Sequence, residues 1–212
     1  GELGAYSHIA TENLFKDAEI KTCTTFEETF EQAYKDPDYK IVIPIENSLA
    51  GRVADIHYLL PKYKLQIHGE HFQAVEHNLL CKQDANINDI KFVRSHAQAI
   101  GQCQNLINKK KFKPIISADT AGSAKDLAEG NDKSIAAIAS SLSAKIYKLK
   151  ILEKNIEDEK GNVTRFLIMG KNIEQPEFSN DKKFITSCIF RVKSEPSALY
   201  KCLGGFATNQ VN

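Results

Sequence analysis

The stretch GNVTRFLIMG, residues 161–170, reads as a buried strand interrupted by two adjacent polar side chains. Side chains in a strand alternate between faces, so Thr164 and Phe166 share one face while Arg165 and Leu167 share the other. One explanation is that Thr164 is an ordinary strand former and Arg165 reaches water at the strand end. The other is that both serve a ligand, and the rest of the chain must decide between them.

Short apolar runs alternate with segments of helical period along most of the chain. In HAQAIGQCQNLINKK, residues 96–110, the apolar positions follow one helical stripe, which predicts a single helix. This alternation predicts an α/β fold with mostly parallel strands. The runs that predict buried strands are KIVIPI (40–45), IKFVRS (90–95), KPIISA (113–118) and SIAAIAS (134–140).

Composition excludes several classes of partner. The 212 residues are 42% hydrophobic and carry a formal net charge of +1, so a globular protein without a polyanion-binding surface is expected. The basic run NKKKFK, residues 108–113, is explained as a solvated helix end. No apolar stretch approaches the roughly 20 residues of a membrane span, which predicts a cytoplasmic protein without nucleic-acid or membrane partners.

Cysteine and histidine spacing predicts neither disulfides nor a metal site. The five cysteines are scattered and lack a C-x-x-C pair. His68 and His71 are an odd number of residues apart, which would place them on opposite faces of a strand. No Gly-rich nucleotide motif is present, so we expect no cofactor.

Four junctions share one pattern, in which small, hydroxyl or amide residues precede the start of a helix. Such loops offer free backbone N–H groups and the positive end of a helix dipole, which suit a bound anion. Loops at one edge of an open sheet converge, so four of them predict a small polar or carboxylated ligand. The residues singled out in them are Ser7, Asn47, Ser48, Ser95, Asp119 and Thr120.

Arginine is scarce, with only Arg52, Arg94, Arg165 and Arg191 in the chain. Its planar fork binds a carboxylate through two hydrogen bonds, so each arginine near these loops is a candidate ligand contact. We expect Arg165 nearest the ligand. The alternative is an ordinary ion pair with a local carboxylate such as Asp158.

Polar residues and a proline at 170–183 break the alternating pattern and read as a linker. Beyond it, FITSCIFRV (184–192) alternates like a half-exposed strand, and SEPSALYKCLGGFATN (194–209) starts like a capped helix. A strand and one helix cannot bury a core alone, and no strand precedes Gly1. We therefore expect the natural protein to extend beyond both ends.

Five segments together resemble the conserved blocks of the prephenate dehydratases. The last is the most specific, because Tyr147, Asp158 and the triplet 164–166 stand at the spacing of the family signature, together with Leu149 and Leu152. Residues 182–212 resemble the start of a regulatory ACT domain, with Ser197 in place of its usual glycine. The five segments are GELGAYSHIA (1–10), IPIENSLAGRV (43–53), RSHAQAIGQC (94–103), SADTAGSAK (117–125) and YKLKILEKNIEDEKGNVTRFLIM (147–169).

The resemblance implies a two-lobed α/β catalytic domain over 1–170, similar to type 2 periplasmic binding proteins, with the substrate between the lobes. One lobe would combine about 1–75 with 155–170, and the other would cover about 76–154. A linker at 171–181 and an incomplete ferredoxin-like ACT unit at 182–212 would follow.

The implied reaction is the loss of carbon dioxide and hydroxide from prephenate to give phenylpyruvate, a decarboxylating hydro-lyase step in L-phenylalanine biosynthesis. By resemblance Thr164 is the catalytic group that donates to the leaving hydroxyl. Arg165 would clamp the side-chain carboxylate, and Phe166 would either wall the ring carboxylate or serve as plain core. Further hydrogen bonds would come from Ser7, Asn47, Ser48, Ser95, Gln102 and Thr120.

Two alternatives stay open at this point. Arogenate, the amino analogue of prephenate, could be the substrate if Glu46 or Asp119 met its ammonium group. A noncatalytic two-lobed module that senses a small acid would share the loops but would have no use for the Thr164-Arg165-Phe166 triplet. For the intact protein the resemblance further implies allosteric control by L-phenylalanine and a homodimer or homotetramer.

Overall fold

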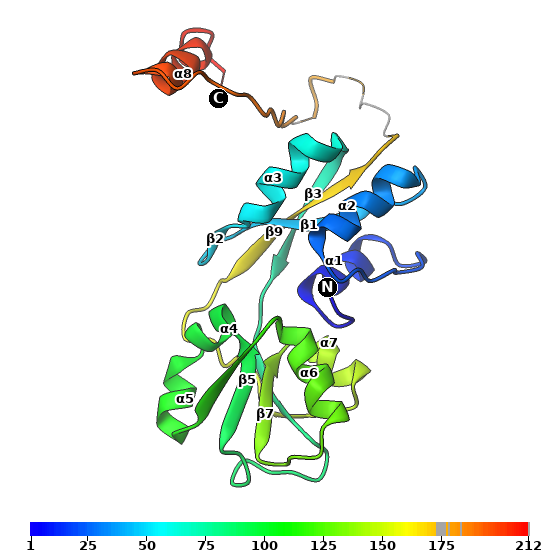
Figure 1. Ribbon diagram of the computed structural model, residues 1–212, viewed down its shortest axis with the longest axis vertical. Coiled ribbons are helices and arrows are strands. Elements are labelled where there is room, and N and C mark those ends of the chain that lie inside the picture. Colours follow the sequence, from blue (N-terminus) through cyan, green and yellow to red (C-terminus); the bar gives the residue numbers. More distant parts are fainter. Residues whose placement is uncertain (173–176, 178, 183, 212) are drawn as a thin grey trace. The chain divides into compact units, whose positions relative to one another are not determined.

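The computed structural model describes residues 1–172, 177, 179–182 and 184–211, and the chain divides into two compact units, 1–174 and 175–212. The first unit contains two β-sheets, each with its own helices (Figure 1). Its elements are α1 (Tyr6–Leu14), α2 (Phe26–Lys35), β1 (Ile41–Asn47), β2 (Gly51–Arg52), α3 (Ala54–Tyr63), β3 (Gln66–Ala74), β4 (Asn78–Cys81), β5 (Phe92–His96), α4 (Ala97–Gly101), α5 (Gln104–Lys110), β6 (Lys113–Ser117), α6 (Thr120–Glu129), β7 (Ile135–Ala139), α7 (Ser141–Ile146), β8 (Lys150–Glu153) and β9 (Val163–Gly170).

The first lobe is built on a sheet with the strand order β2-β1-β9-β3, in which every neighbouring pair is antiparallel. The central strand β9 aligns Leu167 with Ile43 of β1, and alternation brings the apolar side chains of both strands to one face. On that face Leu167 and Met169 pack with residues of α2 and α3, among them Phe30 and Ile56. Helix α1 also contacts β1 and β3.

The second lobe is built on a sheet with the strand order β6-β5-β7-β4-β8. Strand β5 runs parallel to β6 and β7, whereas β4 runs antiparallel to β7 and β8. The expectation of mostly parallel strands is therefore wrong. The chain crosses directly from β3 into β4 and from β8 toward β9, and these crossings add strands without the helical connection that a parallel pair requires.

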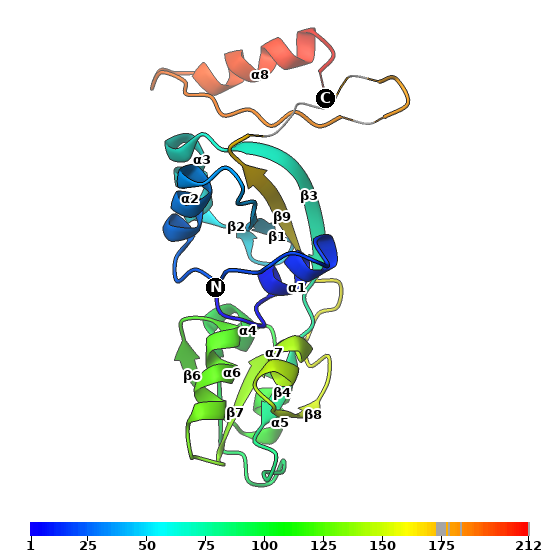
Figure 2. The same ribbon diagram turned by 90° about the vertical axis from the view of Figure 1, so that its right-hand side faces the viewer.

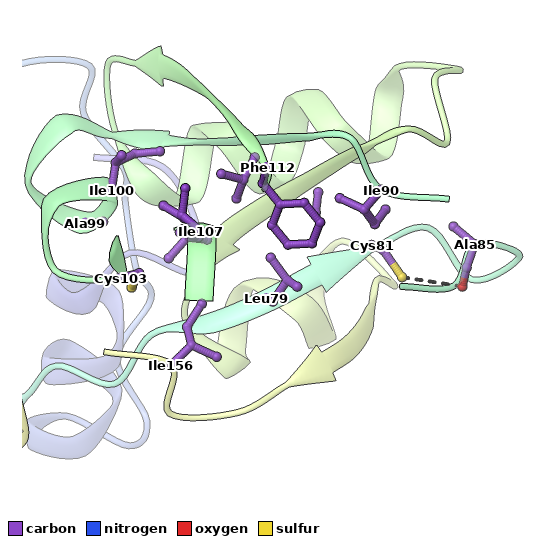
Figure 3. Close-up of a cluster of buried hydrophobic side chains, with 13 residues drawn as sticks. Leu79, Cys81, Ala85, Ile90, Ala99, Ile100, Cys103, Ile107, Phe112 and Ile156 are labelled. Carbon is purple, nitrogen blue, oxygen red and sulfur yellow. Dashed lines mark hydrogen bonds between the residues drawn. The ribbon is translucent and has the colours of Figure 1, made fainter. Parts of the chain in front are cut away.

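Helices on the two faces of this sheet explain its nearly continuous apolar runs. Figure 3 shows the cluster in which Ile100, Cys103 and Ile107 pack against Leu79. On the other face, Leu80 packs with Leu127 of α6 and with small residues of α6 and α7. A strand buried on both faces is apolar at successive positions, as β4 is.

The single helix predicted over 96–110 is two helices, α4 and α5. The Asp158 carboxylate accepts hydrogen bonds from the backbone N–H groups of Gln104 and Asn105, at 2.8 and 3.0 Å. A carboxylate at these unpaired N–H groups stabilises a new helix start at Gln104. The predicted apolar stripe is nevertheless buried as expected.

The second unit contains α8 (Ala198–Thr208). The strand predicted at 184–192 is wrong, because the structure has no strand among the described residues of this unit. An isolated strand has no neighbour to accept its backbone hydrogen bonds, so alternation alone cannot form one. Of the linker predicted at 171–181, residues 173–176 and 178 lie outside the described residues.

Each helix within the described residues is too short or too polar to serve as a membrane span.

Candidate active site

A cavity of about 750 Å³ in the first unit is lined by residues from both lobes. The first lobe contributes residues of α1, α2, β1 and β9 and of the segment between α1 and α2, while the second contributes the starts of α4 and α6. The residues between β3 and β4 and those before β9 also line it, where the chain passes between the sheets (Figure 2). Its polar lining includes Ser7, Asn47, Arg52, His77, His96, Gln98, Gln102, Thr120, Asn162 and Thr164.

Six of the nine predicted site residues line this cavity. Thr164 and Phe166 point to it from β9, as the alternation in that strand predicts. Phe166 is 2% exposed, so it supplies an apolar wall and is packed as a core residue at the same time. The six are Ser7, Asn47, Gln102, Thr120, Thr164 and Phe166.

Ser48 and Ser95 do not line the cavity. The Ser48 hydroxyl accepts a hydrogen bond from Val163 N at 3.0 Å, and Ser48 N donates to Val163 O, which fixes the start of β9. Ser95 is fully buried, and its hydroxyl donates to Ile138 O at 2.7 Å. Both hydroxyls therefore satisfy backbone groups, and His96 and Gln98 take the place predicted for Ser95 in the lining.

Arg165 is also absent from the lining, in contrast to the expectation that it lies nearest the ligand. It lies on the opposite face of β9 from Thr164 and pairs with Glu70 at 2.7 Å and Glu46 at 3.2 Å. The prediction of a local ion pair is closer, although its partners are these two carboxylates and not Asp158. Long-range pairing of β1 and β3 with β9 brings both glutamates to Arg165.

A chain of side-chain hydrogen bonds connects the two lobes through the cavity wall. Asn47 Nδ2 donates to Thr164 Oγ1 at 2.9 Å and to Asn162 Oδ1 at 2.6 Å. Asn162 Nδ2 then donates to Gln102 Oε1 at 3.0 Å, and the same oxygen lies 3.0 Å from His77 Nε2. The His77 Nδ1 atom is 3.0 Å from the Tyr6 hydroxyl.

Two backbone N–H groups fix the direction of the bonds in this chain from Asn47 to His77 Nε2. Asn47 Oδ1 accepts the N–H groups of Leu49 and Ala50 at 3.0 and 2.8 Å, so its Nδ2 atom must be the donor on the other side. Asn162 Oδ1 is then an acceptor and its Nδ2 a donor to Gln102 Oε1. It follows that His77 donates from Nε2, because Gln102 Oε1 can only accept.

This assignment prepares two donors for a ligand. Thr164 Oγ1 accepts from Asn47, which leaves its own hydrogen available for a group in the cavity. Gln102 Oε1 accepts twice, which leaves the Gln102 Nε2 hydrogens for the cavity. Preorganised donors of this kind stabilise negative charge that develops during a reaction.

Burial sets the protonation of the histidine and the tyrosine. It lowers the pKa of His77, although the bond to Gln102 and the charge of Glu157 oppose the shift. It also raises the pKa of Tyr6 strongly, so Tyr6 stays a neutral phenol. A neutral His77 with its proton on Nε2 has an unprotonated Nδ1, which lies 3.0 Å from the Tyr6 hydroxyl. That hydroxyl donates its hydrogen to the carbonyl of Glu76 at 2.7 Å.

Positive charge in the lining comes from Arg52 together with Lys21 and Lys40. Lys21 donates to Gln32 and lies over the Tyr39 ring, and Lys40 lies over the Phe15 ring. Within the described residues Arg52 has no ion pair, in contrast to Arg94 and Arg165. Arg52 is therefore the arginine available to a carboxylated ligand.

Sequence reasoning missed His77 and Asn162, each 3% exposed. Asn162 stands two residues before Thr164, where a polar residue next to Gly161 reads as a turn. His77 ends the stretch HGEHFQAVEH, residues 68–77, in which the spacing of His68 and His71 predicts no metal site. A signal existed in HNLLC, residues 77–81, where a histidine and an asparagine precede a fully apolar run, but only the fold reveals their partners.

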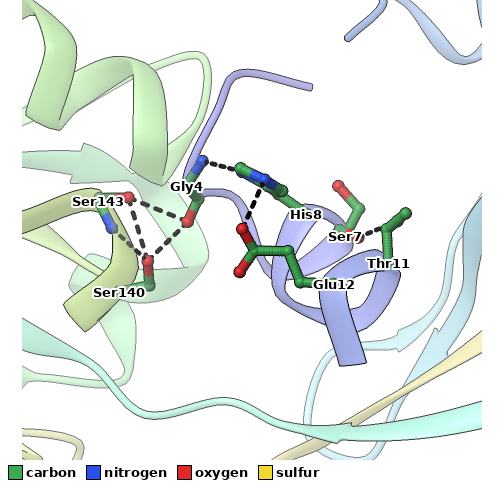
Figure 4. Close-up of polar contacts among 7 residues, drawn as sticks. All are labelled: Gly4, Ser7, His8, Thr11, Glu12, Ser140 and Ser143. Carbon is green, nitrogen blue, oxygen red and sulfur yellow. Dashed lines mark hydrogen bonds and ion pairs between the residues drawn. The ribbon is translucent and has the colours of Figure 1, made fainter. Parts of the chain in front are cut away.

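The N-terminal segment also bridges the two lobes, as Figure 4 shows. The carbonyl of Gly4 accepts hydrogen bonds from the hydroxyls of Ser140 and Ser143, at 2.6 and 3.0 Å, and Gly4 N donates to His8 Nδ1 at 2.9 Å. Gly4 has a φ of +86°, and a Cβ atom there would lie 2.5 Å from Ser143 Oγ. Only glycine fits this approach between α1 and the start of α7.

Fold and site together define a two-lobed α/β protein whose interlobe cavity presents a threonine hydroxyl, carboxamides and an arginine that forms no ion pair with the residues the structure describes. Residues 1–174 match the family model described as prephenate dehydratase. The chain belongs to the prephenate dehydratase family.

Named relatives support this assignment along the chain. It is 39% identical to a bifunctional N-acyl-homoserine lactone acylase/prephenate dehydratase of Komagataeibacter europaeus, covering 100% of this chain and 75% of that protein. It is also 39% identical to arogenate dehydratase/prephenate dehydratase 2 of Arabidopsis thaliana, covering 100% of this chain and 55% of that protein. The chain therefore spans about half the length of this plant relative.

A solved structure has the same fold. The prephenate dehydratase of Arthrobacter aurescens in complex with L-Phe superposes with a TM-score of 0.87, covering 100% of this chain and 71% of that one at 24% identity. The predicted two-lobed α/β fold is confirmed.

Proposed function

We propose that this protein is a decarboxylating carbon–oxygen lyase that converts prephenate to phenylpyruvate. The observation that carries the proposal is the Thr164 hydroxyl, which lines the cavity and accepts a hydrogen bond from Asn47, so that its own hydrogen is available to the cavity. A hydroxyl held in this way can donate a hydrogen bond to an acceptor atom of a ligand in the cavity. The departing hydroxyl of prephenate requires such a donor.

The reaction balances without an external oxidant or reductant. The bond from the ring to its carboxylate breaks and releases carbon dioxide, and the electron pair enters the ring. The bond to the ring hydroxyl breaks with its own electron pair while the pair from decarboxylation completes the aromatic ring, and a proton taken up from solvent converts the departing hydroxide to water. Since a threonine hydroxyl is a weak acid, hydrogen bonding and fixed position supply its contribution.

The remaining lining residues have complementary roles in this proposal. Arg52 binds the side-chain carboxylate, in place of Arg165. Gln102 donates a further hydrogen bond from Nε2. Phe166 presents an apolar wall to the ring carboxylate, and an apolar setting favours loss of its charge as carbon dioxide.

Arogenate is the alternative substrate, and the cavity offers a specific group to test. Of the two carboxylates considered for its ammonium group, Glu46 pairs with Arg165 outside the lining. Asp119 lines the cavity, although one of its oxygens caps α6 by accepting from Gly122 N at 2.6 Å. Asp119 is therefore the candidate that a preference for arogenate would require.

The experiment is turnover by the intact protein offered prephenate and arogenate separately, with phenylpyruvate and phenylalanine as the respective products. We expect a higher kcat/KM for prephenate. A higher value for arogenate, reduced by Asp119→Asn, would reassign the substrate. Binding of either compound without turnover would leave a small-acid sensor as the function.

The acylase activity in the name of one relative is not part of this proposal. Within the described ranges, no serine, threonine or cysteine side chain is hydrogen-bonded to a histidine ring. That pairing is the usual means of activating a nucleophile for acyl transfer.

Regulation by L-phenylalanine, assembly into dimers or tetramers and a cytoplasmic location stay predictions for the intact protein. The first two rest on the resemblance of residues 182–212 to an ACT domain, and the matched family model ends at residue 174.

A further inference from the structure

His77 occupies the point where four parts of the first unit meet. Its backbone N–H donates to Glu157 Oε2 at 3.0 Å, and its carbonyl accepts from Ile156 N, so it joins the two crossings between the sheets. Its ring lies between Tyr6 of α1 and Gln102, which follows α4. The ring is edge-on to that of Tyr6, with centroids 5.8 Å apart.

The His77 ring controls which end of the Gln102 amide faces the cavity. With His77 Nε2–H and Asn162 Nδ2–H both directed at Oε1, the Gln102 amide has one favourable orientation. Rotating that amide by 180° would set its NH2 group against two donors. Without the His77 donor, only the single bond from Asn162 opposes this rotation.

We propose that His77 is a positioning residue of the active site, which acts through Gln102 and has its tautomer fixed by the carboxamide chain from Asn47 through Asn162 to Gln102. This inference rests on the proposed function and extends it. His77 itself does not contact the substrate but orients Gln102, which does. It explains why a 3% exposed histidine is kept between two polar partners. A purely structural role would be served by any side chain that fills the space.

The test is a double-mutant cycle on the full chain with the preferred substrate. His77→Leu removes the donor, whereas His77→Gln keeps an N–H near the position of Nε2. We expect His77→Leu to lower kcat about tenfold, the effect of one lost hydrogen bond, with KM changed less than threefold. His77→Gln should restore kcat to within about threefold of wild type.

The cycle is completed with Gln102→Ala. If His77 acts through Gln102, adding His77→Leu to Gln102→Ala should lower kcat no further than twofold. Thermal unfolding of each variant measures the structural contribution separately. Nitrogen-15 NMR of the His77 ring at pH 7 provides a readout that needs no substrate, with the proton expected on Nε2.

Each outcome is decisive. Tenfold losses that multiply in the double variant, or a proton found on Nδ1, would overturn the inference while leaving wild-type turnover intact. An inactive wild type would refute the proposed function, and the inference would fall with it.

Discussion

Arg52 and Arg165 lie on the two strands that flank β1, but their surroundings differ. Arg165 is held by two carboxylates on the face of β9 that turns away from the cavity, while Arg52 lines the cavity. Replacing each arginine by methionine therefore distinguishes a contribution to folding stability, expected at Arg165, from a contribution to ligand binding, expected at Arg52.

Arg165→Met should lower the free energy of unfolding by about 1 kcal/mol, because it leaves Glu46 and Glu70 without their cation, and should leave KM unchanged. Arg52→Met should raise KM about 10- to 100-fold at nearly constant stability, as expected for a lost charge-assisted hydrogen bond. Urea unfolding and steady-state kinetics measure both. A raised KM in Arg165→Met would return that residue to the ligand.

His77 makes stability depend on pH. Because burial lowers its pKa in the folded protein, the unfolded chain takes up a proton below about pH 6.5 before the folded chain does. Stability should therefore fall as the pH drops from about 6.5 toward the folded pKa. Glu157 acts on His77 directly and Tyr6 lies 3.0 Å from its ring, while Glu76 and Cys103 act on Tyr6.

Urea unfolding of wild type and His77→Gln between pH 5 and 8 isolates this contribution, since the two proteins share every other ionisable group. The wild type should lose more stability than the variant on acidification. Parallel curves would mean that His77 is not held neutral.

At the scale of elements, the local sequence pattern predicts where most strands lie. It does not predict which distant residues those strands pair with. The runs at 40–45, 90–95, 113–118 and 134–140 overlap β1, β5, β6 and β7. The alternation in β9 correctly separated Thr164 from Arg165. Which face meets the cavity depends on partners more than 90 residues away, such as Glu70, and no local pattern encodes them.

The same limit explains the other errors. Ser95 looks like a helix cap in sequence, but β7 supplies the carbonyl that its hydroxyl binds. Asp158, distant in sequence, divides the predicted helix at 96–110. Strand direction was misjudged because direct crossings between two sheets look, in sequence, like successive strands of one sheet.

The N-terminal segment offers a test at this scale. Gly4→Ala should destabilise the protein by about 2 to 4 kcal/mol. Alanine would have to adopt the left-handed backbone conformation of Gly4, and its Cβ atom would clash with Ser143. Gly161→Ala is the matched control. Gly161 has a φ of +84° with open space around it, so only about 1 kcal/mol should be lost.

Thermal or urea unfolding compares the two variants. Equal losses would mean that the approach of Gly4 to Ser143 contributes nothing beyond backbone conformation.

At the scale of the first unit, the cavity is completed by both lobes, so a ligand there should stabilise them together. At a concentration of about 100 Kd, the product phenylpyruvate should raise the free energy of unfolding by about 2.7 kcal/mol. Hydrogen exchange should slow in the crossings at 75–78 and 154–162. Protection confined to one lobe would contradict a ligand held between them.

The central claim is that the Thr164 hydroxyl, oriented by Asn47, donates to the departing hydroxyl of the substrate. The most direct test is kcat of Thr164→Val, which keeps the shape of the side chain but lacks the hydroxyl, against Thr164→Ser, which keeps it. The account predicts that Thr164→Val lowers kcat about 100-fold or more with little change in KM, and that Thr164→Ser stays within about tenfold of wild type. A kcat for Thr164→Val equal to that of wild type would contradict the account.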